Sequence, residues 1–371
     1  MLVWLLATAQ LTRAEAPPAA ERPRIVFFSP NSEANTYWPQ VFRILEKVAQ
    51  DLGFEFVPYS LGVDDRFARE QTILRVLHAE PRPDAVIASV VIGHSQHLLD
   101  ASESLGIPVF ILGPLFPSEL PEVGAAPRRK YKSWAALFNW AEAQKGYALA
   151  KALLAEAEKA NAFARDGSIH VVGVGGDPSW FGSGLRQSGL ARAVAEHPHA
   201  VLEQVVPTKW KREEGHQLTL KLLRRFPEAS VVWAASDQLA VGAVDALTEL
   251  GRVPGKTAFT GGLDLSDVGL QRVQQGSFVA TAATTLLSYA QAAVLIYDYL
   301  GGIDFAAQLG TELEFPTEIA TRENVDQHLR LSRCIPSIDF KQFSKLHNTR
   351  LQRYEFSMPA YLAATAACLR R

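Results

Sequence analysis

Short apolar runs alternate with amphipathic stretches from Arg24 onward. The first run, Arg24–Pro30 (RIVFFSP), is almost continuously apolar, as expected of a parallel strand that is buried on both faces. In the stretch after it, apolar residues recur on one helical face at Val41, Ile44, Leu45, Val48 and Leu52. Gly53 then stands where a helix commonly ends. The pattern predicts a strand followed by an amphipathic helix.

This strand–helix unit repeats in two series along the chain. In the first series we expect strands at Phe54–Tyr59, Asp84–Val91 and Pro108–Leu112, and helices at Phe67–Leu77 and His94–Leu105. A proline-rich, irregular stretch follows at Pro114–Lys132. In the second series we expect helices at Ala143–Ala160, Leu185–Glu196, Glu213–Phe226, Gln238–Leu250, Leu265–Gln275 and Tyr289–Leu300, with strands at His170–Gly175, Val201–Val206, Ser230–Ala235, Ala258–Gly262, Phe278–Ala283 and Glu312–Thr317. Such repeats need right-handed crossovers and parallel sheets.

The two series predict an α/β protein with two doubly wound parallel-sheet lobes joined by a multi-strand hinge. A chain of 371 residues is long enough for two such cores. We expect one lobe from residues 24–139 plus 285–315, and the other from 140–284 plus 316–325. In open α/β sheets ligands bind at the carboxyl ends of the strands, so the cleft between the lobes is the expected site. Residues 326–371 form a C-terminal extension that either wraps a lobe or docks a partner.

The charge of the chain and the sequence of its N-terminus restrict the functions to be considered. The formal net charge is -2 and no long basic run occurs, which argues against nucleic-acid binding. Residues 1–23 resemble an export signal and linker, with an apolar segment at Leu2–Ala9 and a small-x-small cleavage pattern at Ala14–Ala16. We therefore expect a protein exported to the periplasm of a Gram-negative bacterium. Cys334 and Cys368 either pair there as a disulfide or remain two buried thiols.

The spacing of the candidate residues argues against several kinds of binding or catalytic site. The glycine-rich stretch Val172–Gly184 has proline at position 178 where a dinucleotide-binding fingerprint needs glycine, so it is better interpreted as a ligand-facing loop. His94, His97 and Asp100 share helical spacing, but this pattern favours a solvated helix face over a metal site. No phosphate-binding loop or nucleophile elbow occurs. We therefore predict no catalytic residues, no cofactor and no metal, although a catalytic set assembled from distant positions stays open.

Polar and aromatic residues follow six of the expected strands. They are Asn35, Tyr37 and Trp38 after the first strand, then Ser89, Trp210, Ser236 and Asp237, Asp264, and Thr284. Flat aromatic faces suit the C–H surfaces of a sugar, whereas carboxylates and hydroxyls suit its polar groups. For a single residue, helix capping is the simpler explanation, and Asp237 could cap the helix expected at Gln238. The recurrence at six strand ends favours a binding site.

At these residues the chain resembles the ribose-binding proteins, the type I periplasmic binding proteins of ABC sugar importers. The resemblance spans roughly Arg24 to Val325 and rests on three stretches: Asn35–Trp38 (NTYW), Trp233–Ala243 (WAASDQLAVGA) and Gly261–Gly269 (GGLDLSDVG). It implies a fold with two hinged lobes and no enzymatic activity.

The same resemblance implies roles for individual residues. Tyr37 and Trp38 from one lobe, with Trp210 from the other, would sandwich the ligand. Hydrogen bonds to its polar groups would come from Asn35, Ser236 and Asp264. The resemblance also implies that Arg186 faces the cleft. It places Trp140 and Glu142 near the first crossing between the lobes and Thr284 near the second.

The chain departs from the sugar-binding pattern at several positions. Gly113-Pro114 stands where an Asp-Arg pair is usual, Ser236 replaces an amide, and Thr284 replaces a glutamine that is common there. Fewer hydroxyl-reading groups remain, so a furanose-like or more apolar ligand fits as well as a pyranose. The expected partner is an ABC permease or, alternatively, a membrane sensor kinase, and we expect a monomer. A transcription regulator of this fold would need a DNA-binding module before the first strand.

Overall fold

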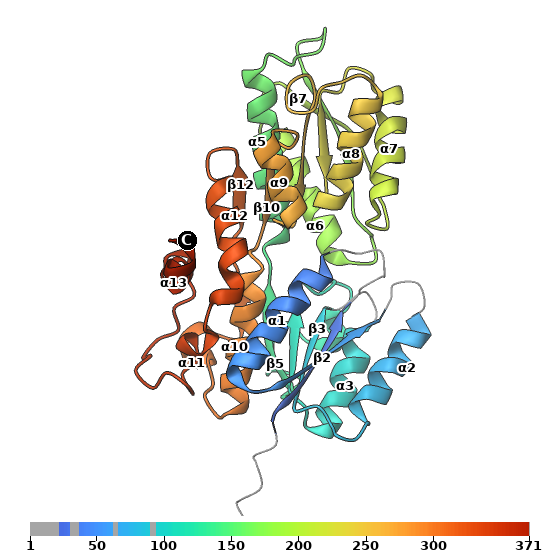
Figure 1. The fold of residues 1–371 in the computed structure, drawn as a ribbon. Coiled ribbons are helices and arrows are strands. Elements are labelled where there is room, and N and C mark those ends of the chain that lie inside the picture. Colours follow the sequence, from blue (N-terminus) through green and yellow to red (C-terminus); the bar gives the residue numbers. More distant parts are fainter. Residues whose placement is uncertain (1–21, 30–36, 62–65, 90–93, 371) are drawn as a thin grey trace, which may run out of the picture.

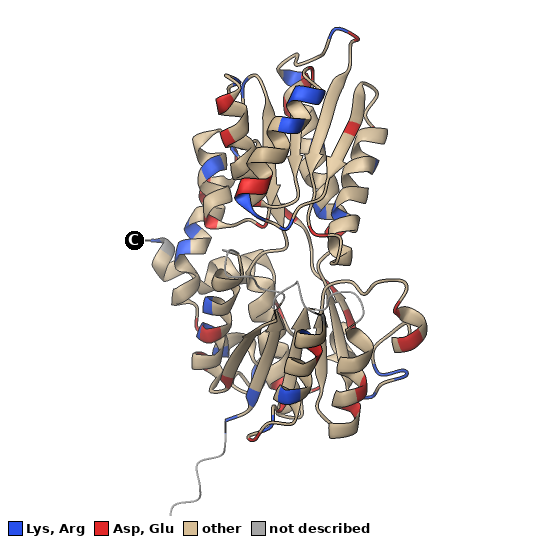
Figure 2. Cartoon of the chain, turned by 90° about the vertical axis from the view of Figure 1, so that its right-hand side faces the viewer, with Lys and Arg blue, Asp and Glu red and all other residues tan. Residues whose placement is uncertain are grey.

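Two α/β lobes, one above the other, make up the computed structural model (Figure 1), which describes residues 22–29, 37–61, 66–89 and 94–370. Each lobe is built on a six-stranded sheet. Basic and acidic residues are interspersed over both lobes in the view of Figure 2. None of the helices in the described ranges is both long and apolar enough to span a membrane. The predicted export signal and Asn35 lie outside the described residues.

The sheet of the first lobe is parallel and has the strand order β11-β5-β4-β3-β1-β2. Its strands are β1 (Arg24–Ser29), β2 (Glu55–Ser60), β3 (Ala85–Ser89), β4 (Val109–Leu112), β5 (Trp134–Asn139) and β11 (Glu312–Glu314). Its helices are α1 (Trp38–Leu52), α2 (Arg66–Leu77), α3 (Ser95–Leu105), α4 (Leu120–Val123), α10 (Leu287–Leu300) and α11 (Ala306–Leu309). In β1, Ile25 and Phe27 pack toward α1 and α10, whereas Val26 and Phe28 pack toward α2 and α3. Because both faces are covered, β1 is apolar at nearly every position.

The sheet of the second lobe has the order β12-β10-β9-β8-β6-β7. Its strands are β6 (Ile169–Val174), β7 (Ala200–Val206), β8 (Val231–Ala234), β9 (Phe259–Leu263), β10 (Ala280–Ala283) and β12 (Glu318–Thr321). Its helices are α5 (Glu142–Lys159), α6 (Phe181–Ala195), α7 (Arg212–Arg225), α8 (Asp237–Glu249) and α9 (Asp267–Gln275). The edge strand β12 runs antiparallel to β10, and the other pairs are parallel. The predicted fold of two parallel-sheet lobes is thus confirmed, with one antiparallel edge strand.

Two strand predictions were wrong in detail. The segment Trp134–Asn139 was not predicted as a strand, yet it is β5 and lies between β4 and β11. Of the strand expected at Glu312–Thr317, only the first half is a strand, β11 of the first sheet, and a strand that was not predicted, β12, follows in the second sheet. The chain therefore passes from one lobe to the other between them, as it also does after β5 and after β10.

The C-terminal extension packs against both lobes of its own chain. It begins with α12 (Val325–Cys334), in which Val325 and Leu329 join the core of the second lobe and Leu331 joins that of the first. At the second lobe, Ser332 Oγ donates to Asp267 of α9 over 2.8 Å. The interpretation of this segment as wrapping the protein itself is therefore correct.

After α12 the extension lies along the first lobe. Its short elements are η1 (Ile335–Ser337), η2 (Phe340–Phe343), α13 (Met358–Ala364) and α14 (Ala366–Leu369). The aromatic residues Phe340, Phe343, Tyr354 and Tyr361 are all buried in the first-lobe core. These side chains are used for packing and do not form an exposed docking surface.

A buried carboxylate on α10 holds the extension in place. Asp298 is fully buried and accepts hydrogen bonds from Ser344 Oγ at 2.5 Å, the Lys345 backbone N–H at 2.7 Å and Tyr354 Oη at 2.9 Å. A buried carboxylate is costly unless its oxygens are satisfied, and here the extension supplies the donors. Detaching the extension would therefore leave Asp298 without these donors.

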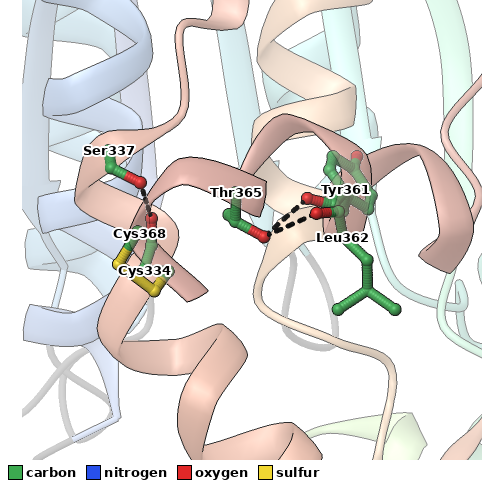
Figure 3. The surroundings of a disulfide bond; sticks show 6 residues. All are labelled: Cys334, Ser337, Tyr361, Leu362, Thr365 and Cys368. Atoms are coloured by element: carbon green, nitrogen blue, oxygen red, sulfur yellow. Dashed lines mark hydrogen bonds between the residues drawn. A yellow bond between two sulfur atoms is a disulfide. The ribbon is translucent and has the colours of Figure 1, made fainter. Parts of the chain in front are cut away.

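The two cysteines form a disulfide that closes the extension on itself. Cys334 at the end of α12 is bonded to Cys368 in α14, with their Cα atoms 5.8 Å apart (Figure 3). Of the two alternatives left open by the sequence, the structure has the disulfide. Nearby, Tyr361 Oη donates to the Leu287 carbonyl at 3.4 Å. The disulfide thus joins α12 to a segment that is docked on the first lobe.

We predict that Cys334→Ser loosens the extension. The disulfide closes a loop with a sequence separation of 34, and the chain-entropy relation assigns a loop of this size about 3–4 kcal/mol. Amide hydrogen exchange in residues 340–365 should accelerate in the variant and, to the same extent, in wild-type protein treated with reductant. Exchange in β1 serves as the internal control, and unchanged exchange in the extension would contradict the prediction.

Candidate ligand-binding site

A cavity of about 980 Å³, counted up to its opening to solvent, lies between the lobes. Residues that follow β1, β5, β6, β7, β8, β9 and β10 contribute to its walls, as the topology of open α/β sheets requires. The lining residues are Tyr37, Trp38, Ser89, Trp140, Glu142, Lys145, Asp177, Ser179, Trp180, Arg186, Trp210, Ser236, Gln238, Asp264, Thr284 and Tyr289.

Most of the site residues expected from the sequence are brought together here. The cavity is lined by Tyr37, Trp38, Ser89, Trp140, Glu142, Arg186, Trp210, Ser236, Asp264 and Thr284. The sequence therefore located the cavity correctly, although ligand contacts by these residues stay a prediction.

Asp237 lies behind the cavity wall, not in it. Its carboxylate is 1% exposed and accepts hydrogen bonds from the backbone N–H and Oγ of Ser266 and from Thr281 Oγ1, at 2.7–2.9 Å. Nor does it cap α8, since the Ser236 side chain accepts from the Leu239 backbone N–H at that helix end. The next residue, Gln238, lines the cavity in its place.

The residues missed by the sequence reasoning come from three places. Asp177, Ser179 and Trp180 belong to the glycine-rich loop after β6. The sequence predicted that this loop faces a ligand, but it did not single out any of these three residues. Lys145 lies one helical turn beyond Glu142, and this i, i+3 spacing was a usable signal. Tyr289 is on α10 and had no comparable signal, because it reaches the cavity only through the packing of that helix.

A buried cluster of charges forms the floor of the cavity. Glu142 Oε2 accepts from Arg186 Nε at 2.5 Å, and Glu142 Oε1 accepts from Lys145 Nζ at 2.8 Å. Arg186 Nη1 donates to the Ala235 carbonyl at 2.7 Å and lies 3.5 Å from Asp264 Oδ1. Glu142, Lys145 and Arg186 are each less than 8% exposed. The cluster links α5 and α6 to the ends of β8 and β9.

Mutual pairing opposes the effect of burial on the pKa of each of these groups. Burial alone would lower the pKa of Arg186, but Glu142 and Asp264 outweigh it and raise that pKa. Burial alone would raise the pKa of Glu142, but Arg186 and Lys145 hold it below its usual value. For Lys145, burial prevails and lowers the pKa, with Glu142 opposing the shift.

Asp264 differs from its neighbours because burial dominates. Burial raises the pKa of this carboxyl to about 7, although Arg186 opposes the shift. The side chain is still 14% exposed and lines the cavity. It can therefore exchange a proton near neutral pH at the point where a ligand would sit.

Two tryptophans of the second lobe rest on glycines. A Cβ at Gly182 would lie 2.3 Å from the Trp180 ring, and a Cβ at Gly176 would lie 1.9 Å from the Trp210 ring. The Arg186 guanidinium carbon lies 5.0 Å from the Trp180 ring centroid and 5.8 Å from that of Trp210. The glycine-rich loop thus provides space for these aromatic side chains.

The opposite wall comes from aromatic residues of the first lobe. Tyr37 Oη and Tyr289 Oη are hydrogen-bonded at 3.1 Å, and Trp140 packs 4.9 Å from the Tyr289 ring centroid. Burial raises the pKa of both tyrosines, so both phenols stay protonated at neutral pH. The cavity consequently has aromatic faces on two sides and charged groups at its floor.

Backbone strain occurs at and beside the cavity. Trp210, Asp264 and Ala141, the residue before Glu142, have φ angles of 67°, 132° and 47°. Non-glycine residues in this region cost of order 1–3 kcal/mol each and persist where the surroundings hold them. For Trp210, the surroundings include Thr208 Oγ1, which accepts from the Trp210 backbone N–H at 3.1 Å.

His94 precedes α3, and His97 and Asp100 within this helix have different partners, Glu70 and Tyr131. Among the described residues, no group of three or more His, Cys, Asp or Glu side chains is placed to hold an ion. The expectation of a solvated face was wrong for His94, which is buried, whereas His97 is half exposed near Glu70.

Comparison with known families decides the identity of the fold. The sequence profile of the periplasmic binding protein domain matches residues 25–302. The chain belongs to the periplasmic binding protein family. Family membership implies a binding protein, not an enzyme, that is exported to the periplasm. No match was found among curated proteins.

Solved structures support the type I fold of this family. A periplasmic sugar-binding protein from Pseudomonas fluorescens has 25% identity and a TM-score of 0.79, with 91% of this chain and 99% of that chain covered. An ABC transporter solute-binding protein from Actinobacillus succinogenes with bound D-allose has 19% identity and a TM-score of 0.67, covering 82% and 100%. The arabinose ABC transporter component from Shewanella sp. ANA-3, bound to L-arabinofuranose, has 16% identity and a TM-score of 0.68, covering 83% and 95%.

We predict that Glu142→Ala destabilises this binding protein by about 3–5 kcal/mol, because the buried Lys145 would lose its paired carboxylate and the buried Arg186 the nearer of its two. Urea denaturation of the variant and wild type measures the change. Glu156→Ala on the same helix is the matched control, since Glu156 pairs with Lys159 at the surface and should cost less than about 1 kcal/mol. Equal, small losses in both variants would contradict the prediction.

Proposed function

We propose that this protein captures a small sugar-like ligand between its lobes and presents it to an ABC permease. Binding of one ligand by both lobes stabilises the closed arrangement, and the permease recognises that arrangement. The ligand shifts the equilibrium only by its stronger binding to the closed state. The periplasm of a Gram-negative bacterium is the proposed location.

The observation that carries this proposal is the composition of the cavity. Flat faces for C–H groups come from Trp38 and Trp140 of the first-lobe wall and from Trp180 and Trp210 of the second lobe. Between them, Arg186, Asp264 and Gln238 offer hydrogen-bonding groups. Aromatic faces combined with paired donors and acceptors match a polyhydroxylated ring better than a purely apolar or a strongly charged ligand.

The solved relatives support the same assignment. They are a sugar-binding protein, a protein with bound D-allose and a protein bound to L-arabinofuranose, and two of the three are components of ABC transporters. The extension gives no reason to prefer a sensor kinase, because its aromatic residues are buried against its own lobes. A permease is therefore the proposed partner.

We predict that Trp210→Ala and Asp264→Ala each weaken sugar binding at least about tenfold, or ~1.4 kcal/mol. The first variant removes an aromatic face, and the second removes a hydrogen-bonding carboxyl. The measurement is isothermal titration calorimetry with a panel of pentoses, hexoses and polyols, including L-arabinose, D-allose and myo-inositol. Native mass spectrometry of freshly purified protein identifies any retained ligand.

Asp267→Ala is the matched control for Asp264→Ala. Asp267 is exposed, lies three residues further along the chain and bonds Ser332 outside the cavity. Its replacement should leave sugar affinity unchanged. Failure of the wild type to bind any sugar of the panel, or unchanged affinity in both site variants, would refute the proposed function.

We also predict that affinity falls as pH is lowered through about 7. A ligand hydroxyl donates to the charged form of Asp264, whereas the free protein retains the proton there up to about pH 7. Deprotonation therefore accompanies binding, and below pH 7 the affinity should fall by up to about tenfold per pH unit. Asp264→Asn should abolish this dependence, and an unchanged pH profile in that variant would contradict the prediction.

A further inference from the structure

Trp180 stands between the ligand cavity and a second cavity beside it. The second cavity has a volume of about 430 Å³. Trp180 lines both cavities, and none of the other residues described for the ligand cavity also lines the second one. Its indole is therefore the side chain that separates the two spaces.

The indole is held in this position from several sides. Its Nε1 atom would lie 3.7 Å from a Cβ at Gly113, which follows β4 of the first lobe. Its ring lies on Gly182 and 5.0 Å from the Arg186 guanidinium carbon, and its centroid is 6.0 Å from that of Trp210. Trp180 thus reaches from the second lobe toward the first, at the position where the first lobe has glycine.

The second cavity has walls suited to a ring without charge. Phe116 of the first lobe and Phe181 of the second meet over it, with ring centroids 5.2 Å apart. The rest of the lining consists of glycine and proline residues of the loop after β6, of Pro207 after β7, and of Ser183, Gly184 and Gln187 on α6. No ionisable side chain is among the described residues that line it.

We propose that Trp180 determines ligand size by confining the ligand to a single ring. A sugar that carries an aglycone or a second ring would need the space behind the indole. This inference rests on the proposed sugar-binding function and adds to it a residue that selects among sugars. Without the Trp180 ring the two cavities would merge, and the extra ring would lie against Phe116 and Phe181.

The test compares each panel sugar that binds with its α- and β-phenyl glycosides. The readout is the ratio of the glycoside Kd to the free-sugar Kd, because this ratio is insensitive to a general loss of affinity. In the wild type we expect a ratio of at least about 100, since steric exclusion from a packed site is severe. In Trp180→Ala we expect a ratio below about 10 for at least one anomer.

Trp180→Leu is the second variant, and it keeps an apolar side chain over Arg186 while opening part of the partition. Its ratio should lie between those of the wild type and Trp180→Ala. Trp210→Ala is the matched control, because Trp210 lines only the ligand cavity and its loss should leave the ratio high. Circular dichroism and thermal melting establish that each variant is folded.

The outcomes separate the inference from the proposed function. If the wild type binds no free sugar, the proposed function fails. If it binds a free sugar but neither Trp180 variant lowers the ratio, the inference is overturned and the function stands. An equal decrease in Trp210→Ala would also overturn the inference, because the effect would then be general loosening. A crystal structure of Trp180→Ala with the glycoside should have the phenyl ring against Phe116.

Discussion

The ion pair between Glu142 and Arg186 is the interaction on which the rest of the site depends. Glu142 begins α5 directly after the chain enters the second lobe, and it fixes a guanidinium that also contacts the ends of β8 and β9. The same guanidinium lies beside Trp180 and Trp210. One buried pair therefore sets the position of a helix, two strand ends and two aromatic walls. Its burial is tolerated because each group has a charged or carbonyl partner.

Much of the architecture could be predicted from the sequence, because buried parallel strands and amphipathic helices leave clear periodic patterns. The predictions failed where a sequence pattern is short or where tertiary contacts determine the structure. β5 has six residues between an irregular loop and a helix. The strand expected at Glu312–Thr317 ends early at Glu314, because the chain leaves the first sheet there and joins the second sheet as β12. Disulfide formation between Cys334 and Cys368 depends on a distance that spacing does not determine.

The same contrast between local sequence patterns and tertiary contacts applies to the candidate site. Strand ends located the cavity, since topology places them at one edge of each sheet. The direction of each side chain was harder to predict from the sequence. Asp237 points toward Ser266 and Thr281, and the adjacent Gln238 lines the cavity. Tyr289 reaches the cavity by the packing of α10. Trp180 could be associated with a ligand-facing loop, but its place opposite Gly113 requires both lobes to be in position.

The path of α12 has a mechanical consequence for the proposed closure of the lobes. Val325 and Leu329 are embedded in one lobe and Leu331 in the other, so this helix acts as a strut parallel to the three interlobe crossings. Any rotation that widens the cleft must shear these contacts or bend the helix, and the work required grows with the angle. The disulfide returns the far end of the extension to the same strut. In the proposed closure of the lobes, part of the resistance to opening thus comes from torsional stiffness outside the cleft, independently of what the cavity holds.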